Sequence, residues 1–127
     1  MIRVKATVTG EKDTPPFFRV FEYSDESYDI IFLPSVNKIK EKLVIGLRIN
    51  INECLALYCN YVVSQLRAQN LIEHIEGGAK ALLSPYSVMI GVPETIRKIV
   101  FHVELDKVQQ YVITLQEPIK IPRYVLS

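Results

Sequence analysis

The stretch NINECLALYCNYVVSQLRAQ, residues 50–69, predicts one long helix around which the rest of the chain is organised. Asn50, with Glu53 three residues later, is typical of a helix N-cap and its capping-box partner, and Asn52 is an alternative cap. Apolar residues then recur at helical spacing in a wide stripe: Leu55, Cys59, Val62 and Leu66, flanked by Cys54, Tyr58, Tyr61 and Val63. A helix with so narrow a polar side is normally covered on most sides, so we expect it to be buried.

The two cysteines, Cys54 and Cys59, both lie on this predicted helix. Residues five apart on a helix are too far apart to form a disulfide. Reactive thiols need an exposed, electropositive setting, whereas these face the apolar stripe. We interpret them as small buried residues in a reducing compartment. No spacing of Cys or His typical of a zinc site is present, and we expect no metal and no cofactor.

The length of 127 residues and the 49% hydrophobic content are typical of one globular domain. The net charge of +1 argues against a protein whose main role is to neutralise many phosphates. No apolar run reaches the roughly 20 residues that span a bilayer. The sequence begins directly with an alternating strand and shows no signal peptide, so we expect a cytoplasmic protein without a membrane partner.

The N-terminal third predicts strands. Residues 2–9 alternate between apolar and polar side chains, as in a half-buried strand. Residues 17–23 and 28–33 are rich in aromatic and β-branched residues and predict a hairpin with a loop over residues 24–27. With Tyr23 opposite Tyr28, this register places Glu22 opposite Asp29, a like-charge pair that should cost stability.

The segments on either side of the central helix give weaker patterns. Residues 43–49 fit a strand, although Val36, Ile39 and Leu43 also fit a helical turn. After residue 69, we expect a short helix over 70–76 that ends at Gly77-Gly78, a further turn over 79–83, and a short buried strand over 87–92.

A second hairpin is predicted over residues 97–105 and 108–115, with the turn at Asp106-Lys107. One face then carries Ile99, Phe101, Val103 and Leu105 with Val108 and Val112. The opposite face carries Val100, His102, Glu104, Tyr111, Ile113 and Leu115. Because both faces are largely apolar, we expect both to be covered, by the chain's own helices or by another subunit. Residues 118–127, with prolines at 118 and 122, predict an extended C-terminal arm.

These elements predict a single α+β domain over residues 1–127, in which an antiparallel sheet from the N- and C-terminal hairpins packs on the helix at about 50–69. The favoured function is a non-enzymatic interaction protein that forms a homo-oligomer. Hairpin 97–115 and the C-terminal arm would supply the contact, through Val100, Tyr111, Ile113, Leu115, Tyr124 and Leu126.

The alternative function is a small nucleic-acid-binding module. Basic residues on the first strand and in segment 38–48 would contact phosphates, with aromatic residues nearby for stacking: Arg3, Lys5, Lys38, Lys40 and Lys42. Edge lysines that prevent aggregation of sheets give the same pattern.

Other chemistry has less support in the sequence, and we assign no catalytic residue. His102 and Glu104 share a strand face, with Tyr111 opposite, but no nucleophile accompanies them. An acidic group could bind a cation but lacks the glycine-centred spacing of a calcium loop: Glu22, Asp25, Glu26 and Asp29.

Overall fold

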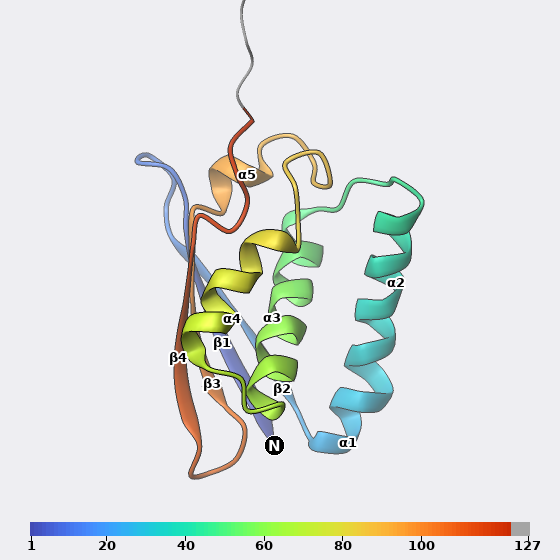
Figure 1. Cartoon of the computed structure of the whole chain (residues 1–127), viewed down its shortest axis with the longest axis vertical. Helices are drawn as coiled ribbons and strands as arrows, with labels where there is room; N and C mark the ends of the chain where they lie inside the picture. Colours follow the sequence, from blue (N-terminus) through green and yellow to red (C-terminus); the bar gives the residue numbers. More distant parts are fainter. Residues whose placement is uncertain (123–127) are drawn as a thin grey trace, which may run out of the picture.

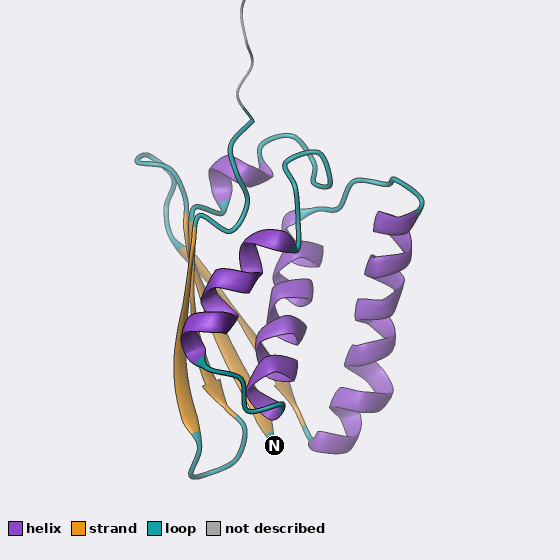
Figure 2. Ribbon diagram, viewed as in Figure 1, coloured by secondary structure: helices purple, strands orange, loops and turns teal. Residues whose placement is uncertain are grey.

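In the computed structural model, which describes residues 1–122, the chain forms two layers, a sheet and a group of helices on one face of it (Figures 1 and 2). The α+β fold predicted from the sequence is confirmed. The elements follow in the order β1 (Ile2–Thr9), β2 (Phe17–Tyr23), α1 (Asp25–Ser27), the π-helix η1 (Tyr28–Phe32), α2 (Leu33–Val44), α3 (Ile51–Arg67), α4 (Ile72–Gly78), the 3₁₀ turn η2 (Ala79–Ala81), α5 (Val92–Thr95), β3 (Lys98–Glu104) and β4 (Gln110–Gln116).

The sheet is antiparallel throughout, with the strand order β2-β1-β3-β4. The two ends of the described chain therefore meet in one sheet, because β1 pairs with β2 on one side and with β3 on the other. The alternation predicted for residues 2–9 is confirmed. Its apolar side chains are buried against the helices: Ile2, Val4, Ala6 and Val8.

Helix α3 forms as the sequence predicts and lies against the inner face of the sheet (Figure 1). Its N-cap Asn50 accepts a hydrogen bond from the Glu53 N–H at 2.9 Å, and the Glu53 carboxylate accepts one from the Asn50 N–H at 3.1 Å. This capping box fixes the start of the helix. Both cysteines are buried, and burial raises the pKa of the Cys54 thiol to about 12 and that of Cys59 well above its usual range.

The strand predicted over residues 28–33 is wrong, because these residues form η1 and the start of α2. Ser24, predicted to lie in a loop, is a helix N-cap whose side chain accepts a hydrogen bond from the Ser27 N–H at 3.0 Å. Tyr28 and Phe32 are buried while Ile30 and Ile31 are exposed, which is the spacing of a helix rather than a strand.

The predicted pairing of Glu22 with Asp29 is consequently absent from the described residues. Glu22 lies 3.9 Å from the Arg3 guanidinium, and Asp29 lies 3.7 Å from the Arg67 guanidinium. The like-charge pair was a result of the wrong register.

The second hairpin exists, but its predicted register is wrong. The connection runs over residues 105–109, because the Asp106 carboxylate accepts hydrogen bonds from the N–H groups of Val108 and Gln109 at 2.8 and 2.7 Å. These bonds to Gln109 and Val108 lower the pKa of the Asp106 carboxyl. The wider loop places Tyr111 opposite Val103, and Val112 opposite His102.

The corrected register changes which side chains of β4 face the core. Ile113 and Leu115 are buried against the helices, whereas Val108 and Val112 are exposed. The outer face is therefore more polar than predicted, and α2, α3 and α4 all lie on the inner face (Figure 2). The chain's own helices therefore cover only one face of this hairpin, and cover of the other face by another subunit stays a prediction.

Three smaller segments also differ from their predictions or refine them. Residues 43–49 form no strand beyond the single bridge at Ile49, since α2 extends to Val44. The strand predicted over residues 87–92 does not form. Val88 instead makes a single parallel bridge with Ile49. The arm after β4 returns to the core at Ile119, which is fully buried.

Candidate interaction surface

Two loops meet at one end of the molecule, one between α2 and α3 and the other between η2 and α5 (Figure 1). The first begins with a Schellman motif at the end of α2. The Leu47 N–H donates to the Lys42 carbonyl at 2.9 Å and the Gly46 N–H donates to the Leu43 carbonyl at 3.1 Å. Gly46 has a φ of +82°, a conformation that glycine adopts without strain. The motif turns the chain sharply away from α2.

The second loop contains its own turn and is hydrogen-bonded to the first. The Ser87 N–H donates to the Ser84 carbonyl at 3.1 Å. The Ile49 N–H then donates to the Ser87 carbonyl at 3.1 Å, and the Met89 N–H donates to the Ile49 carbonyl at 2.9 Å. Ile49 and Val88 are fully buried. The two loops are therefore hydrogen-bonded to each other, and both are anchored in the core where Ile49 meets Val88.

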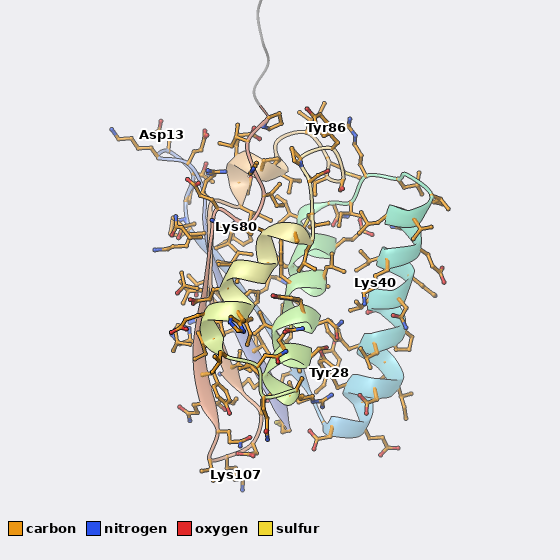
Figure 3. All side chains as sticks on the ribbon, in the orientation of Figure 1. Asp13, Tyr28, Lys40, Lys80, Tyr86 and Lys107 are labelled. Atoms are coloured by element: carbon orange, nitrogen blue, oxygen red, sulfur yellow. The ribbon has the colours of Figure 1, made fainter. Side chains whose placement is uncertain are left out.

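The two loops and the last residue of α2 carry large apolar side chains that are exposed to solvent. Ile90 is 90% exposed and Val44 is 86% exposed. We call the set the loop patch: Val44, Ile45, Leu47, Tyr86, Met89 and Ile90. Figure 3 shows Tyr86 at this end of the molecule, with Lys107 at the opposite end. Exposed apolar patches on a soluble domain commonly mark protein interaction sites.

A shallow hollow of about 180 Å³ lies within this surface, lined in part by Arg48, Tyr86, Ile90 and Glu94. The second loop ends at Gly91, whose φ of +91° favours glycine. The Thr95 hydroxyl donates to the Gly91 carbonyl at 2.8 Å and holds the start of α5 in place. The hollow is thus framed by backbone that is fixed by hydrogen bonds at both ends.

The structure separates the residues predicted to associate with a second copy. Ile113 and Leu115 are in the core, while Val100 and Tyr111 are partly accessible. Tyr124 and Leu126 lie outside the described residues. Val100 and Tyr111 lie on opposite faces of the sheet, because Tyr111 pairs with the inward-facing Val103. The hairpin therefore presents no common surface formed by these four described residues.

The basic residues predicted to contact nucleic acid are likewise divided between two layers. Arg3 and Lys5 lie on the outer face of the sheet, where Arg3 faces Glu22 and Lys5 lies over the Phe18 ring. Lys38, Lys40 and Lys42 belong to α2, on the opposite layer, and the Lys42 ammonium is 2.6 Å from the Glu53 carboxylate. The chain does not gather them into one basic surface.

The other chemical groups considered from the sequence do not converge. His102 faces Lys5 and Val112 across the strands, not Tyr111. Within residues 1–122, no group of three or more His, Cys, Asp or Glu side chains is arranged to hold a metal ion. Asp25 lies 3.5 Å from the N-terminal ammonium.

Among the described helices, none is long and apolar enough to cross a membrane.

The loop patch itself was missed in the sequence. The signal that could have identified it is the run Val44–Leu47 around Gly46, since apolar residues in a turn cannot all reach the core. The run of apolar residues over 87–92 also favours a buried strand in the sequence, but of these residues only Val88 and Val92 are buried.

Comparison with known protein families gives the context for this surface. Residues 24–119, more than half of the 127-residue chain, match the family described as the urease gamma subunit. The chain belongs to the urease gamma subunit family. A comparison with curated proteins found no match. The match begins at Ser24, directly after β2, and ends at Ile119, after β4.

Membership of the urease gamma subunit family corrects the functional predictions. The predicted non-enzymatic role is wrong, because this family provides a subunit of an enzyme. The alternative of a nucleic-acid-binding module is also wrong, on the same finding and on the separation of its basic residues. An oligomeric assembly agrees with the family, since a gamma subunit is one of several subunits.

Proposed function

We propose that this chain is a subunit of a urease-type enzyme complex and that it binds a neighbouring subunit through the loop patch. The family match supports the first part of this proposal. The second part is supported by one observation: large apolar side chains are exposed at the end of α2 and on the two loops, which are hydrogen-bonded to each other. A fixed apolar surface loses little conformational entropy on binding, which favours tight association.

The composition of the surface fits a protein partner. Tyr, Met and Arg are enriched at the centre of protein interfaces, and Tyr86, Met89 and Arg48 lie together around the same hollow. Tyr86 can bury its ring while its hydroxyl keeps a polar contact at the rim. A partner subunit with an apolar centre and an acidic group opposite Arg48 would complement this surface.

The proposal assigns the docking function to this chain and the groups that hydrolyse urea to another chain of the complex. Two features of the described residues support this division. The Cys54 and Cys59 thiols, the strongest nucleophiles of the chain, are buried inside the fold with raised pKa values. His102 is exposed on the outer face of the sheet, between Lys5 and Val112.

We also predict that copies of this chain bind each other within the complex. A complex that contains several gamma-type subunits brings copies of this chain close together, with or without direct contact between them. Sedimentation velocity of the isolated chain at tens of micromolar tests direct contact: a monomer at that concentration contradicts it.

The experiment that tests the proposed function is isolation of the chain from its native host with a small tag, followed by size-exclusion chromatography. We expect the tagged chain to elute at a mass well above 14.6 kDa, together with activity that releases ammonia from urea. Elution of all tagged chain without urea hydrolysis, from cells whose extract hydrolyses urea, would contradict the proposal.

A further inference from the structure

The hairpin of β1 and β2 lies outside the part of the chain that matches the urease gamma subunit family. The match begins at Ser24, and β2 ends at Tyr23. The boundary of the match therefore coincides with the boundary between this hairpin and the helices that follow. Yet β1 is an inner strand of the sheet, so a segment outside the match occupies a central place in the fold.

Within the matched region, the two outer edges of the pair β3 and β4 have different partners. On the side of β4, the Glu76 carboxylate of α4 accepts a hydrogen bond from the Thr114 N–H at 2.7 Å. On the side of β3, the backbone groups are paired by β1 over the whole length of the strand, from Lys98 to Glu104. The N-terminal hairpin is what closes this second edge.

The hairpin also fills an apolar groove beside β3. The inward side chains of β1 are fully buried, and Phe21 of β2 joins them. At the far side, Phe21 packs edge-on against Phe32 of η1 with ring centroids 5.6 Å apart, and Tyr23 packs against Phe32 at 5.2 Å. The groove is therefore bounded by β3 on one side and by the aromatic rings of η1 on the other.

We propose that residues 24–119 form a strand-accepting groove along β3, and that in this chain the groove is occupied by the chain's own hairpin, residues 1–23. The hairpin acts as a built-in ligand of the matched region. It adds strands by backbone pairing and inserts alternate side chains, as peptides do when they extend an exposed sheet edge. In this chain the edge of β3 is consequently closed to strands of other subunits, which leaves assembly to other surfaces.

The register defines the chemistry that the groove accepts. Ala6 pairs with Phe101, while the larger Val4 and Val8 pair with Val103 and Ile99. All three side chains of β1 are fully buried, so the groove takes an extended segment with aliphatic residues at alternate positions and a small residue opposite Phe101. The outward side chains of β1 contact solvent and impose no such restriction.

A displacement experiment in the full-length chain tests this inference. Ala6→Asp places a carboxylate in the dry groove and should expel the chain's own hairpin. A fluorescent peptide of residues 1–23 should then bind this variant and raise its thermal stability. Binding to the wild-type chain should be weaker by at least about 100-fold, because its tethered hairpin competes at a high effective concentration.

Two peptides and a second measurement make the test decisive. A peptide with Ala6→Leu should not bind, whereas a peptide with Thr7→Asp, altered on the outer face, should bind like the wild-type sequence. Hydrogen exchange of the wild-type chain should show β1 and β2 opening while α3 and β4 stay protected. The inference is overturned if the peptide neither binds nor stabilises the Ala6→Asp chain, or if β1 exchanges only with α3 by global unfolding.

Discussion

Helix α3 and the loop patch are both rich in large apolar side chains, but they differ in what covers them. On α3, Leu55, Cys59 and Val62 are fully buried by the sheet and the other helices. In the loop patch, Leu47, Tyr86 and Ile90 face solvent although their loops are anchored in the core by Ile49 and Val88. The comparison teaches that apolar content alone does not tell whether a segment stabilises its own fold or binds another chain.

The difference arises from backbone geometry. A helix directs residues at i, i+3 and i+4 to one side, so α3 can bury a continuous stripe. Short loops have no such period, so consecutive apolar residues point in different directions and only some of them reach the core. The stability of the fold should therefore depend on α3, and association should depend on the loop patch.

The largest expected effect is on α3. Leu55→Ala removes a fully buried side chain beneath the sheet and should lower the free energy of unfolding by about 2–5 kcal/mol. Denaturation by guanidinium chloride, followed by circular dichroism, measures this loss. Ile90→Ala in the loop patch serves as the matched control and should change stability by less than about 0.5 kcal/mol. Equal losses of unfolding free energy in the two variants would show that the loop patch stabilises the fold as much as α3 does, and would contradict this account.

The next effect is a pH dependence that comes from the α3 thiols. Burial raises the pKa of Cys54 to about 12, whereas an unfolded thiol ionises near roughly 8.5. The unfolded chain therefore releases the proton first, and stability falls as pH rises above about 8.5. Each thiol contributes a slope of at most about 1.4 kcal/mol per pH unit.

Denaturation between pH 8 and 9, where few tyrosines of the unfolded chain ionise, measures this slope. Cys54→Ala should reduce it, since one of the two thiols is removed. A stability that stays level over this range would mean that the thiols are accessible in the folded chain.

A smaller effect separates two buried tyrosines. The Tyr28 hydroxyl donates to the Asn60 side chain at 3.0 Å, whereas the buried Tyr58 hydroxyl has no hydrogen-bond partner among residues 1–122. Tyr28→Phe should therefore lower stability by about 1 kcal/mol. Tyr58→Phe should be neutral or stabilising, because it removes a buried polar group that gains nothing from the fold. The same denaturation series measures both, and the reverse order would contradict this account of the core.

Much of the fold was predictable where one local pattern decides the structure. The alternation over residues 2–9 and the helical stripe after Asn50 each have a single periodicity, and both predictions are confirmed. The segment over residues 28–33 has no such pattern, because β-branched and aromatic residues favour strands while Tyr28 and Phe32 have helical spacing. Packing of these two rings against Phe21 and Tyr23 favours the helix in the folded chain.

The candidate site was harder to predict for a related reason. The register of the second hairpin depends on the side-chain hydrogen bonds of Asp106, and an error there moved Ile113 and Leu115 to the wrong face. The loop patch depends on the bridge between Ile49 and Val88, two residues far apart in the sequence. The bridge has no local signal, whereas the Asp106 contacts are local turn chemistry that hydrophobic periodicity does not reveal.

The most direct test of the central claim compares two equally exposed apolar residues at opposite ends of the molecule. Ile90 in the loop patch is 90% exposed, and Val108 in the connection between β3 and β4 is 89% exposed. Each is replaced by Asp in the tagged chain, and the complex is isolated from the native host and assayed for ammonia release from urea. We predict that the Val108→Asp chain co-purifies with the activity of the wild type, whereas the Ile90→Asp chain elutes alone and inactive while remaining folded. Equal recovery of activity with both variants would contradict the assignment of the loop patch as the contact surface.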